Sequence, residues 1–387
     1  MSRYRMQLKE HGFDAHGLSA PGLAGWVYSI LLLLTTFPLS AAEVDTVAKQ
    51  YIAQALQGDL SEAGALFNDL TKNNGSSLDL ALAEQFRHRF IAQDEDDFPE
   101  SGNPFMDQLL TIYRDYWTQS LLGEMDAEEG TEWLENSLNN YLIKHNYIAS
   151  LENHNDILSK LESVIHQEGF YAERSLAPPW QDLILWKTQQ IKSYDIELTE
   201  KVQTVDVVFM DDFLSIGWSD FATLGMTSTG GWAAADALYC VSWAWNQDSE
   251  NFQVSYLKHE GRHFADFDLF PNLRAIDLEY RAKLTELAYA SSTLPRLLTK
   301  FTANGSANPE SPHAFANYRV IRDLYQVIFK RAMPETGNPW EWVRADRVNP
   351  AARSLLDTHT KLLDKDGALI TQGVLTAQVQ KLPMTQH

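Results

Sequence analysis

The hydrophobic pattern of this chain changes its period after Pro178-Pro179, and this change limits the fold classes open to it. Before it, apolar residues recur at spacings of three and four, as in the segment 105–117, which indicates amphipathic helices. After it, the segments 187–198 and 201–213 alternate and are rich in β-branched residues, which predicts a hairpin of two strands. We therefore expect an α+β fold that is mostly helical, with a small mixed sheet.

The position of this change predicts two domains. Residues 43–180 are expected to form a helical accessory bundle, and residues 181–365 a second domain that ends in helices, followed by a tail at 366–387. The hairpin should turn near Thr199-Glu200. The Gly-rich stretch 223–235 predicts a tight turn that leads into another strand at 238–245.

The first 42 residues predict a targeting signal. Three cations lie within residues 1–9, an apolar run follows at 26–38, and small residues stand at 40–42, an order typical of a cleaved secretory signal. The run is shorter than the roughly 20 residues that span a bilayer. We expect a periplasmic or secreted protein with no membrane span after cleavage, and an uncleaved N-terminal anchor is the alternative.

Charge and cysteine content exclude several partners. The 387 residues include 31 Lys and Arg against 52 Asp and Glu, a formal charge of -21. Such an acid excess argues against nucleic acid as a partner, because phosphate backbones attract cationic surfaces. The single cysteine, Cys240, cannot form an intramolecular disulfide and is expected to be a buried small apolar residue. Any metal site must then use histidine and carboxylate ligands.

One motif in the second domain points to metal chemistry, namely His259-Glu260-Gly261-Arg262-His263. Residues 247–249 offer N-cap candidates, and an apolar stripe continues past the motif, so we expect one helix of about four turns here. Residues i and i+4 project from the same helix face, so both imidazoles can reach one metal ion. Glu260 lies about 100° further around the helix, beside that ion but not on it. Chance gives this pattern roughly 0.02 times in a chain of this composition.

With a strand before it and a helix after it, the motif resembles the active-site helix of the zincin metallopeptidases, over about residues 205–286. The metzincin branch is excluded by Asp266 and Leu269, which stand where it needs Gly and then His or Asp. The gluzincin branch takes a glutamate from the next helix, and Glu279 follows a chain reversal at 270–272. The resemblance implies Zn²⁺ bound by His259, His263 and Glu279, with Glu260 activating a zinc-bound water that attacks a peptide carbonyl of a peptide or protein substrate.

The residues around this ligand set leave alternatives open. Glu286 is a competing carboxylate, which we interpret as a solvated surface acid. Many gluzincins place an aspartate four residues after the ligand glutamate to orient a zinc histidine, but this chain has Lys283 there. Asp266 or Asp277 is expected to supply that hydrogen bond instead.

Transition-state stabilisation is expected from the helix that starts at Ser311-Pro312. Resemblance to zincins favours His313 or Tyr318 as the group that stabilises the oxyanion, and an ordinary helix face with a solvated Arg322 is the other interpretation. His359 is a weaker candidate.

Two other functional interpretations remain. The chain is alternatively a non-catalytic helical periplasmic binding or scaffold protein, in which the histidine pair is incidental or holds a structural metal. A third possibility keeps the metal and changes the substrate to a cell-wall peptide or another amide, because specificity depends on pocket contacts that the sequence does not display.

Overall fold

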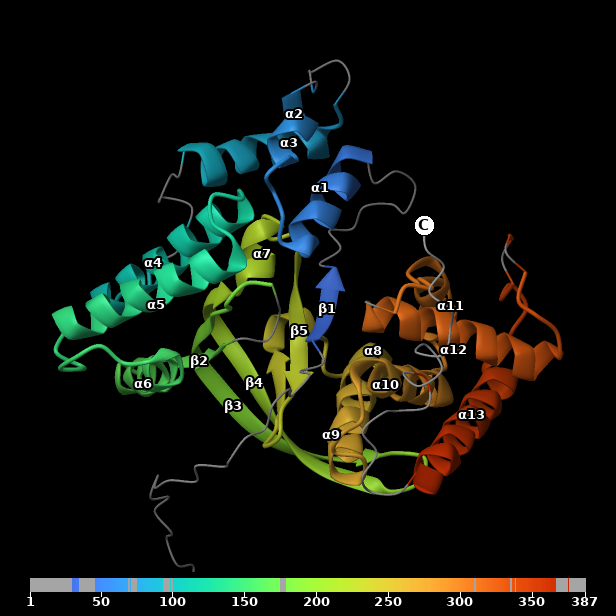
Figure 1. The fold of residues 1–387 in the computed structure, drawn as a ribbon. Helices are drawn as coiled ribbons and strands as arrows, with labels where there is room; N and C mark the ends of the chain where they lie inside the picture. The colour runs from blue at the N-terminus through green and yellow to red at the C-terminus, as the bar shows by residue number, and fades with distance from the viewer. Residues whose placement is uncertain are drawn as a thin grey trace, which may run out of the picture.

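The computed structural model describes most of the chain. The described residues are 30–34, 46–68, 70, 75–92, 98, 100–174, 179–309, 311–334, 336–337, 339–366 and 375. They form an α+β structure in which helices predominate and flank one six-stranded mixed sheet (Figure 1). This confirms the predicted fold class at the level of its secondary structure. The predicted signal segment lies outside the described residues, apart from 30–34.

Helices form the described part of the chain before the sheet. They are α1 (Thr46–Gln57), α2 (Ala63–Asn68), α3 (Ser77–Phe86) with a π-helical extension at Arg87–Ala92, α4 (Pro104–Leu121), α5 (Ala127–Lys144) and α6 (His154–Gln167). Polar caps fix where they begin: the Asn103 side chain accepts a hydrogen bond from the Phe105 N–H, and Asp126 forms a capping box with Glu129. The helical periodicity of this region is thus confirmed.

The sheet has the strand order β1-β5-β6-β4-β3-β2. Its strands are β1 (Ile30–Leu34), β2 (Tyr171–Glu173), β3 (Ile184–Glu197), β4 (Val202–Ile216), β5 (Thr227–Ala233) and β6 (Leu238–Val241). β4 and β6 are parallel, and the other pairs are antiparallel. The predicted hairpin is confirmed as β3 and β4, and the Leu198 N–H donates to the Lys201 carbonyl at 2.8 Å across the expected turn.

The tight turn expected in the Gly-rich stretch is wrong, because its residues 227–233 form β5. All seven residues of β5 are buried, and pairing on both edges overrides the weak strand propensity of Gly and Ala. Small residues are required here: Gly231 has φ 147°, and a Cβ on it would lie 2.3 Å from the Tyr239 carbonyl. The strand expected at 238–245 is shorter than predicted, since a 3₁₀ turn at Ser242–Ala244 ends it.

Alternate residues of β4 pack on opposite faces of the sheet. Val207 and Phe209 belong to the apolar cluster that lies against α9, together with Cys240, which is buried as expected. Val208 and Met210 belong to the cluster on the other face. This two-residue period follows from the pleat of a strand and explains why both faces of β4 are apolar.

The core of the N-terminal helices continues into the second half of the chain. Leu183 and Leu185 of the β3 region and Phe221 of α7 (Trp218–Ala222) belong to the same buried cluster as the apolar residues of α4. The Trp180 indole donates to the Gly58 carbonyl at 2.9 Å. One apolar cluster therefore contains described residues from both sides of the predicted boundary near residue 180.

After the sheet the chain is helical, as expected from residue 251 to about 364. The elements are α8 (Glu250–Phe252), a π-helical turn (Gln253–Lys258), α9 (His259–Leu269), α10 (Ala275–Tyr289), α11 (Leu294–Ala303), α12 (Pro312–Phe329) and α13 (Ala345–Asp366). α10 contacts α9, α12 and α13, and the far end of the β3–β4 hairpin curves beneath α9 towards α13 (Figure 1). Within the described ranges, no helix combines the length and the apolar character that crossing a bilayer requires.

Gly217, between β4 and α7, provides a test of the packing at the junction. We expect Gly217→Ala to lower the melting temperature more than Gly225→Ala does. Both positions have positive φ, which strains an alanine, and Gly217 at φ 92° and ψ 176° lies in a region that is essentially restricted to glycine. At position 217 a Cβ would also lie 2.4 Å from Asp182 Oδ1, and Asp182 is held by the N–H groups of Leu183 and Trp218.

Among the described residues, nothing lies within 4 Å of a Cβ built on Gly225, so that variant shows the effect of positive φ without a steric contact. Thermal melting followed by circular dichroism gives both values. Equal losses at the two positions would show that Asp182 does not fill the space beside Gly217.

Candidate metal centre

The motif lies on a helical stretch that is continuous from Glu250 to Leu269. It begins as expected, because the Ser249 hydroxyl accepts a hydrogen bond from the Phe252 N–H. A π-helical turn at Gln253–Lys258 then precedes His259, a feature that the sequence analysis did not predict. π turns inside helices are frequent at functional sites, since they change which residues share a face.

α9 is buried through its first two turns, and its glycine permits this. Gly261 lies against Ile196 of the hairpin, where a Cβ would be 2.7 Å from Ile196 Cδ1. The Lys258 ammonium donates to the Glu197 carbonyl at 2.7 Å. The hairpin thus covers the outer face of α9 and keeps this part of the helix away from solvent.

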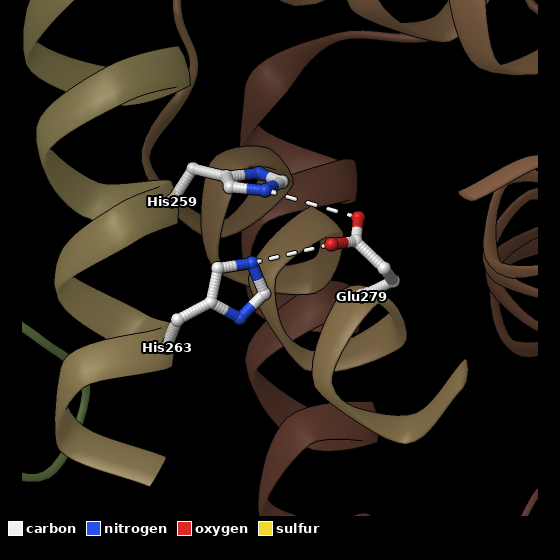
Figure 2. A group of neighbouring side chains, drawn as sticks. All are labelled: His259, His263 and Glu279. Carbon is white, nitrogen blue, oxygen red and sulfur yellow. Dashed lines mark ion pairs between the residues drawn. The ribbon is translucent and has the colours of Figure 1, made fainter. Parts of the chain in front are cut away.

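His259, His263 and Glu279 form one buried group, with one ligand atom from each within 4.8 Å of the others. His263 Nε2 lies 3.3 Å from Glu279 Oε1, and His259 Nε2 lies 3.8 Å from Glu279 Oε2. Figure 2 shows both imidazoles projecting from α9 towards the carboxylate on α10. The i,i+4 spacing and the expected third residue are therefore brought together, and the group can hold a metal ion.

Glu286 orients the first histidine, which corrects its interpretation as a surface acid. Its side chain is buried, and Glu286 Oε1 lies 2.8 Å from His259 Nδ1. A carboxylate at Nδ1 favours the tautomer that carries its proton there and leaves Nε2 as a lone-pair donor. Burial opposes ionisation of Glu286, but His259, Lys283 and the Ser255 hydroxyl together outweigh it and lower the pKa of this carboxyl.

The two aspartates expected to orient a metal-site histidine make other contacts. Asp266 instead accepts from Arg281 Nε at 2.7 Å and pairs with Arg262 Nη1 at 3.2 Å. Asp277 Oδ1 lies 3.0 Å from Nε2 of His359, which therefore links α13 to α10. The expected hydrogen bond comes from Glu286 because residues 279 and 286 are seven apart, which returns to the same helix face after two turns.

Two charged clamps hold α9 and α10 in position. At one end, Glu250 accepts hydrogen bonds from the N–H groups of Ser291, Ser292 and Thr293, at 2.6, 2.9 and 3.0 Å. Burial raises the pKa of Glu250, but hydrogen bonds from this loop outweigh it and lower the pKa to about 2. At the other end, Asp266 joins both helices through arginine, and Glu200 in the hairpin turn accepts from Arg262 Nη2 at 2.8 Å.

α10 is buried along nearly its whole length although it carries several charged side chains. The buried ones are Asp277, Glu279, Arg281, Lys283 and Glu286. Burial works against ionisation of Glu279, but His313 and Lys283 outweigh it and hold its pKa well below the ordinary value. Lys283 Nζ lies 3.3 Å from Glu279 Oε2. Charged groups at this depth need partners, which marks α10 as more than a packing element.

Glu260 is completely buried beside this group. Its two carboxylate oxygens have no hydrogen-bond partner among the described residues. Burial, followed by the charges of Glu279 and Glu286, raises its pKa well above the ordinary value, and the charge of Lys283 opposes this rise. Burial likewise lowers the pKa of His263, so that its imidazole is held neutral and able to donate a lone pair.

Of the two favoured oxyanion candidates, the structure brings one to the group. His313 Nδ1 lies 2.8 Å from Glu279 Oε2, and the His313 side chain is 41% exposed. Tyr318 lies five residues further along α12, about 140° around the helix. Its described contacts are with Phe315 and Arg322, and none joins it to the group.

Comparisons with protein-family models, curated proteins and solved structures give no match. The chemistry therefore rests on the side chains themselves. Two imidazole nitrogens and one carboxylate oxygen suit a divalent metal of borderline softness, and a set of three leaves further coordination positions open.

Three features of the site were missed by the sequence analysis. Lys283 and Glu286 follow Glu279 at i+4 and i+7, so helical periodicity alone places all three on one face of α10. That signal was available. The π turn before His259 had no such signal in the spacing of the residues.

Metal content tests the ligand set directly. We expect the protein as purified to carry near-stoichiometric divalent metal, and His263→Ala and Glu279→Ala to lose it during dialysis, since each removes one of three ligands. Elemental analysis by mass spectrometry gives the metal content. His88→Ala is the matched control, because His88 is exposed and lies far from the motif in the sequence. This variant should retain the metal.

Glu286→Gln should still bind the metal, but with lower affinity. Loss of the carboxylate behind a ligand histidine typically costs about 10–100-fold in metal affinity. Full metal retention by His263→Ala, or equal losses in the control, would exclude this group as the metal site.

Proposed function

We propose that this chain is an exported zinc-dependent metallopeptidase of the gluzincin type, with Zn²⁺ held by His259, His263 and Glu279. The observation that carries the proposal is a buried three-residue ligand group with Glu260 beside it, whose carboxylate has no hydrogen-bond partner in the described chain. A buried unpartnered carboxylate is costly, and such groups persist where function requires them.

The residues present fit a dication. Three charged side chains shift the pKa of Glu260. The carboxylates of Glu279 and Glu286 raise it, and the buried ammonium of Lys283, the one cation among them, lowers it. The raised pKa of Glu260 favours its protonated form, and Lys283 then balances one of the two remaining carboxylates. A divalent cation would supply further counter-charge and favour the ionised form of Glu260, and the histidine and carboxylate donors are those that Zn²⁺ accepts.

When bound, Zn²⁺ polarises a carbonyl and lowers the pKa of a water molecule to about 7. Glu260 supplies the proton transfers: it lies one residue after His259, close to the ligands but turned about 100° away from them. A general base works best when its pKa is near the operating pH, and the burial of Glu260 moves its pKa in that direction. The same carboxyl can then deliver the proton to the leaving amine.

His313 is the favoured oxyanion donor. It contacts Glu279, and it is partly exposed, so a substrate can approach it. A preorganised donor at the developing negative charge is typically worth a factor of about 10²–10³ in rate. Tyr318 has no comparable contact, and we therefore place this role on His313 alone.

Substitution of the proposed general base separates catalysis from metal binding. We expect Glu260→Gln to keep its metal and lose about 10²–10⁴-fold in peptide hydrolysis, because glutamine retains the shape but cannot accept the proton. Cleavage of casein and of a mixed peptide library, with metal content measured on the same samples, provides the assay.

Glu132→Gln, on the exposed face of α5, is the matched control. A fully active Glu260→Gln variant would refute the general-base role. A zinc-loaded wild-type protein that hydrolyses no peptide would instead support the scaffold interpretation, with the metal in a structural role.

A further inference from the structure

Lys283 is a buried cation that the proposed chemistry does not use. The residue is 5% exposed, and its ammonium lies 3.3 Å from Glu279 Oε2 and 5.2 Å from the centre of the Phe301 ring. An ammonium at this depth requires a partner, because burial of an unpaired charge is costly. The partner of Lys283 is the carboxylate that is proposed to bind the metal.

The position of Lys283 on α10 brings its charge to all three buried glutamates of the site. Residues 279, 283 and 286 are four and three apart, so their side chains share one face of the helix. The ammonium helps to lower the pKa of Glu279 and of Glu286, and it opposes the raised pKa of Glu260. Lys283 therefore supplies counter-charge to the buried acids, which is also what a dication would supply.

An ammonium and a dication at the same carboxylate work against each other. The ion pair of Lys283 with Glu279 stabilises the site without metal, and this attraction weakens when the carboxylate shares its electrons with a metal ion. Positive charge added at Glu279 also repels the ammonium, and such repulsion is strong where water is excluded. Both effects favour the metal-free form, so the charge of Lys283 lowers the affinity of the site for metal.

The other cationic partner of Glu279 is placed differently. His313 contacts the same carboxylate oxygen, but its side chain is partly exposed, so water screens any charge that it carries. Lys283 is enclosed between α10 and Phe301 of α11, and its charge acts on the site without that screening.

We propose that Lys283 is an internal counter-ion that competes with the metal for Glu279 and sets the metal affinity of the site below that of its ligands alone. This role rests on the proposed function, since it requires metal at Glu279. The ammonium keeps the acids of α10 together before metal is added, so the ligands need little rearrangement to bind it. The same charge weakens binding, so the occupied fraction of the protein depends more strongly on the surrounding zinc concentration.

Neutral substitution of Lys283 tests this role. We expect Lys283→Met to bind Zn²⁺ at least about tenfold more tightly than the unsubstituted full-length chain, because methionine fills similar space beside Phe301 without a charge. Titration of metal-stripped protein with Zn²⁺ against a chromophoric chelator gives the dissociation constants. Without metal, the melting temperature of Lys283→Met should fall, and saturating Zn²⁺ should raise it by more than in the unsubstituted chain.

Lys361→Met is the matched control. Lys361 also pairs with an acid four residues before it, Asp357 at 2.6 Å, but its side chain is 69% exposed, and its loss should leave the Zn²⁺ affinity unchanged. Lys283→Gln is a second neutral variant in case methionine impairs folding. Structural damage at position 283 would weaken Zn²⁺ binding, whereas loss of a competing charge tightens it.

Equal or weaker Zn²⁺ binding by both Lys283→Met and Lys283→Gln would overturn this role, and so would equal tightening in Lys361→Met. Peptide hydrolysis separates it from the proposed function. If the neutral variants bind Zn²⁺ more tightly at a site that Glu279→Ala abolishes, but the zinc-loaded chain hydrolyses no peptide, the proposed function fails and the role of Lys283 stands. Zinc-dependent hydrolysis with unchanged affinities would give the reverse result.

Discussion

The burial of several carboxylates around two imidazoles is the constraint on which the rest of this site depends. Glu260, Glu279 and Glu286 lie where water cannot solvate them, and ionised groups in such surroundings require a counter-charge or a proton. Lys283 supplies one positive charge at Glu279. A divalent cation between α9 and α10 would lower the remaining cost of ionising these carboxylates.

Contacts around the site keep its buried carboxylates from moving apart, so their cost of burial is not relieved in that way. Asp266 binds arginines from both ligand helices, and Glu250 ties the start of the motif stretch to the loop after α10. The hairpin turn reaches the same network through Glu200 and Arg262. Because these contacts lie on either side of the ligands, α9 and α10 keep a fixed spacing, and the histidines need little rearrangement to bind an ion.

The sequence predicted those parts of the site that depend on one helix, and missed those that depend on packing between elements. His259 and His263 follow from i,i+4 spacing, and Glu279 came from resemblance to a family whose next helix supplies the third ligand. Glu286 was wrongly interpreted as a surface acid because it lies further from the chain reversal than Glu279 does. Helix periodicity places both residues on one face of α10. β5 was missed because its Gly and Ala residues have low strand propensity, and only pairing on both edges makes it a strand. β1 falls within an apolar run that is equally typical of a signal segment.

Anomalous X-ray diffraction at the zinc absorption edge, from crystals of the protein purified with zinc, tests the central claim most directly. We expect one strong peak between α9 and α10, about 2.0–2.2 Å from Nε2 of His259, Nε2 of His263 and one carboxylate oxygen of Glu279. A zinc peak at another place, with these three side chains bound only to one another, would contradict the assignment of this buried group as the metal centre.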